Sequence, residues 1–313
     1  YHGESFYSDM LPEIEQMLRD SGILEESRGD LGIELEKPLG FVRIFAADGR
    51  SLYITRDIAT AIYREKHFKP TQIKYVVAAQ QNLHFKQLIG IMQRLGHPVA
   101  DKMQHVSFGF VPGQGTRGGG AISLRQFLNE MYQHALDAYK NQVTKKPEGV
   151  DESAVAEAVA VGATYFYYLS RSNVKDLQFD WKTALNFQGD TGPYLQYAVA
   201  RINGIVERAA AENLSVPDSI DPELIREDSA YELVSLIARF NEAVERAAQT
   251  HEPHHIAVYL LDLAKAFSRA YLDLMVIGTE PKVATARLGL FKAVQNVLSC
   301  GLRLIGVPCV ERM

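Results

Sequence analysis

A change in hydrophobic periodicity after residue 122 constrains the fold of this chain most. Nearly every later segment carries apolar residues three or four positions apart, the spacing of one helix face. These segments span 123–141, 151–170, 193–213, 229–249, 255–276 and 283–306. Short connections rich in Pro, Ser and Asp, such as 214–223, are typical of links between helices, and no fixed-period repeat favours a solenoid. We therefore predict an all-α bundle for residues 123–313.

Before residue 123 the chain alternates between segments with helical periodicity and segments with the composition of strands. An amphipathic helix over 9–22 is followed by a strand-rich stretch over 31–54, in which 48-DG-49 is a candidate hairpin turn. We then expect a strand at 51–54, a helix from Asp57, a strand at 73–79, a helix at 84–96 and a strand at 104–111. Strands separated by helices predict parallel pairing through right-handed crossovers. This is about half of a doubly wound nucleotide-binding sheet, and we expect the other half upstream.

The composition indicates an ordinary globular chain of two domains. It has 313 residues, of which 47% are hydrophobic and 23% charged, and it lacks the run of about 20 apolar residues that a membrane span needs. The net charge of -5 argues against a uniformly basic nucleic-acid surface, although local basic faces remain open. The two cysteines lie outside CxxC spacing, which favours a reducing compartment, the cytoplasm. The start, YHGESFYSDM, lacks an initiating Met and a signal pattern, so we interpret the chain as part of something longer.

An aromatic hydroxyl and a carboxylate follow the strand predicted at 51–54. Tyr53 and Asp57 are four residues apart, with Thr55 able to cap the turn between them. Ligands of open α/β sheets bind at the carboxyl ends of strands, and a carboxylate beside a phenol suits a guanidinium. The alternative is an ordinary helix start with an acidic first turn.

Two further predicted strand ends carry groups that could orient a small ligand. The run 80-QQNLHFKQ-87 supplies Gln and His side chains, or is simply a polar turn with a helix cap. The next strand end offers His105, Phe108 and Gly109. Phe108 could pack against a flat base, or belong to the core like most strand phenylalanines.

Two other motifs give weaker signals. In 116-TRGGG-120, glycine N–H groups and Arg117 suit a phosphate, but the run matches neither GxGxxG nor GxxxxGK[ST]. The cluster 251-HEPHH-255 has metal-ligand residue types, and its first and last histidines could share a helix face. Pro253 interrupts it and nothing completes a ligand set, so we interpret these histidines as structural or solvated and expect no protein-bound metal.

Taken together and in order, these motifs resemble the class I arginyl-tRNA synthetase family. The matching runs are LYITRDIATAIY, YVVAAQQNLHFKQ, HVSFGFV, TRGGGAISL, GDTGPYLQYAVAR and the final ERM, which cover the chain from end to end. The resemblance implies a catalytic-domain insertion at 1–50, the second half of a Rossmann-like catalytic domain at 51–122 and a helical anticodon-binding domain at 123–313.

The resemblance also implies roles for residues. The arginine pocket would contain Tyr53, Asp57 and Gln81, with Asp57 opposite the guanidinium. The ATP site would contain His84, His105, Phe108, Gly109, Thr116, Arg117, Gly118 and Gly119. Contacts to arginine tRNA would come from Tyr194, Tyr197, Arg201, Tyr271 and Met313. The implied reaction is ATP-dependent activation of L-arginine and its transfer to tRNA, with Mg²⁺ accompanying ATP and with neither DNA nor a membrane as partner.

The sequence departs from the family pattern at two signatures. An HIGH-like tetrapeptide is absent, and 115-GTRGGG-120 stands without a lysine where many relatives carry a KMSK-like run. We therefore expect this chain alone to be inactive. A non-catalytic tRNA-binding or scaffold relative is the alternative function, and a nucleotide-binding α/β protein unrelated to tRNA is a third.

Overall fold

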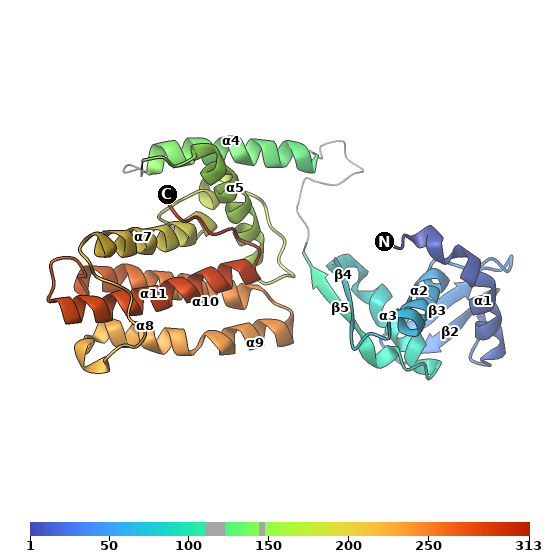
Figure 1. Ribbon diagram of the computed structural model, residues 1–313. Coiled ribbons are helices and arrows are strands. Elements are labelled where there is room, and N and C mark those ends of the chain that lie inside the picture. Colours follow the sequence, from blue (N-terminus) through green and yellow to red (C-terminus); the bar gives the residue numbers. More distant parts are fainter. Residues whose placement is uncertain (110–122, 144–147) are drawn as a thin grey trace. The chain divides into compact units, whose positions relative to one another are not determined.

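The computed structural model describes residues 1–109, 123–143 and 148–313. The chain divides into two compact units, Tyr1–Phe110 and Val111–Met313, which we call the α/β unit and the helical unit (Figure 1). Each unit has its own buried apolar core. Among the helices of the described ranges, none combines the length and apolar character needed to cross a membrane.

The α/β unit begins with helices packed near an antiparallel sheet. A 3₁₀ helix η1 (Glu4–Met10) and helix α1 (Leu11–Asp20) precede strands β1 (Glu25–Ser27), β2 (Asp30–Leu35) and β3 (Gly40–Phe45). The strands pair antiparallel in the order β1-β2-β3. The predicted turn at Asp48 and Gly49 is confirmed, because it joins an antiparallel bridge between Phe45 and Ser51 and Gly49 has a φ of +83°.

A parallel strand pair follows. Strands β4 (Ile73–Ala78) and β5 (Met103–Phe108) pair in register from Ile73 opposite Met103 to Ala78 opposite Phe108. The connection between them contains the 3₁₀ helix η2 (Ala79–Gln81), helix α3 (Asn82–Arg94) and the 3₁₀ helix η3 (Ala100–Lys102). This confirms the predicted parallel pairing through a helical crossover.

The strand predicted at residues 51–54 is wrong. Helix α2 (Ile54–Phe68) already starts at the last of these residues, and only Ser51 forms an isolated bridge. The Thr55 side chain is fully buried and its hydroxyl donates to the Leu52 carbonyl oxygen at 2.5 Å, which holds the chain in a turn before the helix. Tyr53 and Asp57 therefore lie at a helix start and not at the end of a strand.

The helical unit contains the predicted bundle. Its helices are α4 (Leu124–Gln142), α5 (Glu152–Leu169), α6 (Trp181–Ala184), α7 (Gly192–Ala211), η4 (Pro222–Leu224), α8 (Asp228–Ala238), α9 (Phe240–Thr250), α10 (His254–Asp273) and α11 (Pro281–Leu304) (Figure 1). The single helix predicted over 229–249 is two helices, α8 and α9. The break follows Leu236, whose carbonyl accepts both from the Arg239 N–H at 3.0 Å and from the Tyr259 hydroxyl at 2.9 Å.

The motif GDTGPYLQYA forms the start of α7 and its contact with α5. Thr191 caps α7 by accepting from the Tyr194 N–H at 3.2 Å. A Cβ atom on Gly192 would lie 2.4 Å from the Gly162 carbonyl oxygen, so the two backbones touch there. Buried Gln196 then donates to the carbonyls of Ala158 at 2.9 Å and Pro308 at 2.8 Å. Glycine, a cap and a buried amide thus fix the position of α7.

Candidate functional site

Three predicted site residues meet at the first turns of α2 and α3. The Nε2 atom of His84 lies 2.7 Å from Oδ2 of Asp57, and 24% and 22% of these two side chains are exposed. Because a carboxylate oxygen can only accept, His84 donates this hydrogen bond. The ring of Tyr53, at the N-cap of α2, lies 5.8 Å from the His84 ring, and 55% of Tyr53 is exposed.

The electrostatics of this group favour a cation. The negative charge of Asp57, burial and the charge of Glu4 raise the pKa of Tyr53, and Arg56 only partly offsets them. Arg56 is itself paired with Glu4 at 3.3 Å. The site therefore offers a carboxylate and a protonated phenol to an incoming group, which suits a positively charged ligand with several N–H donors.

The remaining predicted residues of the α/β unit lie around the carboxyl ends of β4 and β5. Gln81 ends η2 with an exposed side chain, three residues before His84. His105 donates from Nε2 to the Val77 carbonyl oxygen at 2.9 Å, and its ring stacks on Phe85 at 4.6 Å. Phe108, the last residue of β5, is exposed and is followed by Gly109.

The structure shows one pairing that the sequence did not predict. The structure brings His84 to Asp57, whereas the sequence resemblance assigned them to different ligands. The predicted phosphate-loop residues Thr116, Arg117, Gly118 and Gly119 lie outside the described residues. Sequence reasoning also missed Tyr75, a buried neighbour whose pKa burial raises to about 12.

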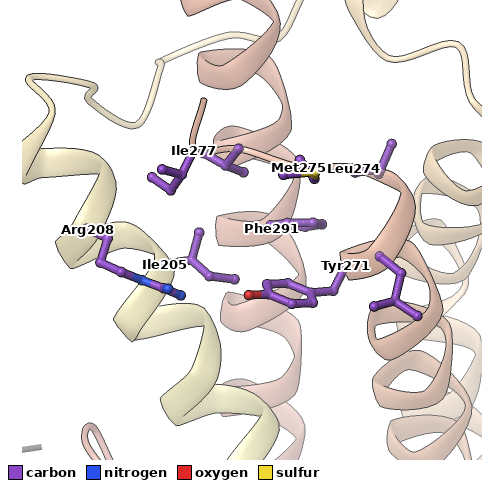
Figure 2. Close-up of a pocket in the computed structure, with 9 residues that line it drawn as sticks. Ile205, Arg208, Tyr271, Leu274, Met275, Ile277 and Phe291 are labelled. Carbon is purple, nitrogen blue, oxygen red and sulfur yellow. The ribbon is translucent and has the colours of Figure 1, made fainter. Parts of the chain in front are cut away.

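A second group of predicted residues surrounds Tyr271 in the helical unit. The guanidinium carbon of Arg201 lies 3.8 Å from the centre of the Tyr271 ring, and Arg208 extends from α7 toward the Tyr271 hydroxyl (Figure 2). Burial acts to raise the pKa of Tyr271, but hydrogen bonds from Arg208 and Arg201, together with their charges, lower it overall. An apolar cavity of about 410 Å³ adjoins this group and is lined by Ile205, Arg208, Tyr271, Leu272, Leu274, Met275, Val276, Ile277 and Phe291.

Sequence reasoning missed Arg208, although a signal for it existed. Arg201 and Arg208 are seven residues apart, two turns of helix, so they lie on the same face of α7. A search for basic residues at helical spacing from Arg201 would have found Arg208.

The other predicted RNA-contact residues are separated. The Tyr194 hydroxyl lies 3.0 Å from Oγ of Ser268, and the Tyr194 ring packs against the main helical core. Tyr197 is 37% exposed. Met313 is 6% exposed and belongs to the smaller apolar cluster that includes Met131. Of these three side chains, that of Tyr197 offers the most free surface.

The segment 251-HEPHH-255 is a connection between helices. His251 is the C-cap of α9, with a φ of 59°, and α10 starts at His254, so His251 and His255 do not share a helix. Glu252 accepts hydrogen bonds from Ser172 Oγ at 2.9 Å, Asn173 N at 2.8 Å and His254 Nδ1 at 3.1 Å. The segment fastens the chain after α5 to the start of α10. Within residues 1–109, 123–143 and 148–313, no group of three or more His, Cys, Asp or Glu could hold a metal ion.

Comparisons with known proteins cover both units. Residues 1–181 match the catalytic domain of class I tRNA synthetases for arginine (R), and residues 195–313 match the DALR anticodon binding domain. The arginine–tRNA ligase of Halothermothrix orenii is 36% identical over 318 residues, and that of Streptococcus mutans is 37% identical over 320. Both alignments cover 100% of this chain and 55% of the relative, so the chain spans about half the length of these relatives.

Solved structures show the same fold. The arginyl-tRNA synthetase of Thermus thermophilus is 25% identical and superposes with a TM-score of 0.86, over 97% of this chain and 58% of that one. The arginyl-tRNA synthetase of Plasmodium falciparum is 22% identical and superposes with a TM-score of 0.83, over 99% of this chain and 54% of that one. At this identity the comparison shows a likeness of fold alone. The fold is thus part of a class I catalytic domain followed by a helical DALR domain. Because the catalytic-domain model alone matches more than half of the residues, the chain belongs to the arginyl-tRNA synthetase family.

Proposed function

We propose that this chain is part of an arginine–tRNA ligase, which activates L-arginine with ATP and transfers it to arginine tRNA. The group of Tyr53, Asp57 and His84 supports this proposal most directly. It presents a carboxylate that is largely shielded from water beside a phenol hydroxyl. A guanidinium supplies both the positive charge and the planar N–H donors that such a pair accepts. We propose that Gln81, which is exposed at the end of η2, contacts the amino acid as well.

The proposed chemistry has two steps. The arginine carboxylate attacks the α-phosphorus of ATP, an O–P bond forms, and pyrophosphate leaves with the electrons of the broken bond. A ribose hydroxyl at the tRNA end then attacks the activated carbonyl and releases AMP. Neither step needs a covalent bond to the protein, so positioning and charge stabilisation carry the catalysis.

We propose that ATP binds near His105, Phe108 and Gly109 together with Mg²⁺. We assign its phosphates to residues 116–119.

We further propose that the helical unit contacts the anticodon loop. An exposed phenol (Tyr197), a ring beside two arginines (Tyr271) and an adjoining apolar cavity offer stacking surfaces and positive charge to unstacked bases and phosphates. Tyr194 and Met313, which we also proposed as RNA contacts, pack in two different apolar clusters of the helical unit and offer less surface to RNA. The proposed domains remain an insertion at 1–50, the second catalytic half at 51–122 and the anticodon-binding domain at 123–313, in a cytoplasmic protein.

Arginine-dependent exchange of pyrophosphate into ATP, with arginine tRNA present, tests the function. It is measured on the 313-residue chain and on the product of the whole reading frame that encodes it. We expect exchange from the latter, and an Asp57→Ala variant to lose it by about 100-fold or more, because an ion pair in a shielded pocket is removed. The control is Asp101→Ala, which removes an exposed carboxylate on η3.

Two results would count against the proposal. If Asp57→Ala leaves exchange unchanged, the arginine pocket lies elsewhere. If the unaltered protein shows no exchange but still binds tRNA, the non-catalytic relative becomes the better description.

A further inference from the structure

We propose that His84 is a positioning residue of the arginine site, which holds one oxygen of Asp57 and directs the other toward the guanidinium. The inference rests on the proposed function. It differs from the role implied by family resemblance, which placed His84 against ATP. Its basis is the 2.7 Å contact between Nε2 of His84 and Oδ2 of Asp57.

The contact leaves the two carboxylate oxygens unequal. Oδ2 accepts from His84, while no hydrogen bond to Oδ1 comes from the described residues of the α/β unit. A carboxylate free to rotate about its terminal bond presents its oxygens over a broad range of directions. One held at Oδ2 presents Oδ1 in a single direction, which suits the fixed N–H directions of a planar guanidinium.

His84 is itself held in place. The next residue, Phe85, is buried in the α/β core, and the two rings meet edge to face at 5.3 Å. On the other side lies the Tyr53 ring, at 5.8 Å. Because α3 starts directly after β4 and η2, the crossover between the parallel strands determines where His84 stands. The sheet and its crossover therefore fix the position of His84, and one hydrogen bond from His84 fixes the direction of the Asp57 carboxylate.

This arrangement predicts a specific kinetic pattern. Without His84, Asp57 keeps its charge but loses its fixed direction, so arginine should bind more weakly while ATP binding is unaffected. For His84→Ala in the product of the whole reading frame, we expect the KM for arginine to rise about tenfold, which corresponds to about 1.4 kcal/mol. We expect the KM for ATP and kcat to change less than about twofold. His84→Gln, whose amide N–H reaches about as far as Nε2, should restore most of the arginine KM.

The control is His67→Ala. His67 lies ten residues beyond Asp57 on α2, about 15 Å along the helix axis. Its Nδ1 atom lies 3.0 Å from the Tyr63 carbonyl oxygen, and its ring stacks on that of Tyr63 at 3.9 Å. It should leave both KM values unchanged. Thermal unfolding of each variant establishes that the fold is kept, and His84→Gln serves as the test variant if the alanine variant does not fold.

The outcomes separate this inference from the function on which it rests. A raised KM for ATP with an unchanged KM for arginine would return His84 to the ATP site and overturn the inference. An unchanged KM for both substrates in His84→Ala, with a clear loss in Asp57→Ala, would also overturn it while the proposed function stands. If Asp57→Ala itself has no effect on arginine, the proposed function fails as well.

Discussion

Glu252 fastens two distant parts of the helical unit, and its removal should destabilise that unit measurably. Its side chain is 21% exposed and accepts three hydrogen bonds, from Ser172, from the backbone of Asn173 and from His254. Asn173 adds a fourth connection by donating from Nδ2 to the His251 carbonyl oxygen at 2.7 Å. These bonds join the chain after α5 to the start of α10.

The expected magnitude follows from the number and kind of these bonds. A hydrogen bond to a charged group contributes about 1.5–3 kcal/mol, and bonds that share one acceptor group do not add fully. Part of the Glu252 side chain also meets water, which weakens its interactions. For Glu252→Ala we expect a loss of about 3 kcal/mol in the free energy of unfolding. For a unit of this size that corresponds to a fall in Tm of about 6–12 °C.

Urea unfolding followed by circular dichroism, with thermal scans in parallel, measures this loss. Glu245→Ala is the matched control, because Glu245 is an exposed glutamate on neighbouring α9. It should change the free energy of unfolding by less than about 0.5 kcal/mol. If Glu252→Ala lowered the free energy of unfolding no more than the control does, the segment 251–255 would be a solvated connection and the reasoning would be refuted.

The pH dependence of this effect has a defined sign. Burial acts to raise the pKa of Glu252, but hydrogen bonds from Asn173, Ser172 and His254 outweigh it and hold the pKa below its usual 4.5. An acid with a lowered pKa stabilises the folded state above its usual pKa and loses that contribution as the pH falls through the folded value. The stability gap between the unaltered protein and Glu252→Gln should therefore narrow steadily below pH 4.5.

Three further predictions follow from the helical unit. Burial and the charges of His254 and Arg246 lower the pKa of His255 below 6.5. The unfolded chain therefore takes up the proton more readily, and the free energy of unfolding should fall as the pH drops below 6.5. Thermal scans at about pH 7.5 and about pH 5.5 should show a smaller fall for His255→Gln. Gly192→Ala should lower Tm by several degrees, because its Cβ atom would lie 2.4 Å from a backbone oxygen, and an unchanged Tm would contradict the contact. Tyr271→Ala should weaken binding of an anticodon stem-loop, measured by fluorescence anisotropy, by about 1–3 kcal/mol, whereas Tyr231→Ala, at an exposed tyrosine on α8, should not.

Long amphipathic segments were predictable because their periodicity is a local property. The helices over 123–141, 151–170 and 283–306 agree with α4, α5 and α11 to within about two residues, the usual uncertainty of helix ends. The break between α8 and α9 was not predictable, since Tyr259, which donates to the Leu236 carbonyl there, comes from another helix. The start of α2 was missed because Leu52, Tyr53 and Ile54 have the β-favouring composition of a strand.

The candidate site was predictable in its members but not in its pairings. Tyr53, Asp57 and His84 stand out as polar groups at element boundaries. That Asp57 and His84 share a hydrogen bond depends on how α2 and α3 pack, across 27 residues of sequence. The same holds for Arg208 and Tyr271, which come from α7 and α10 and were brought together only by the fold.

The contact between Gly192 and Gly162 affects the positions of residues much further along α7. The helix is anchored at its first residue by touching backbones, while Arg208 extends from its far end, sixteen residues and about 24 Å away. A tilt of about 5° at the anchored end would displace the guanidinium end of the helix by about 2 Å, given that length. A substitution at a buried glycine far from the proposed RNA contacts would thus move Arg208 relative to Tyr271, although Arg208 lies more than four helical turns further along α7.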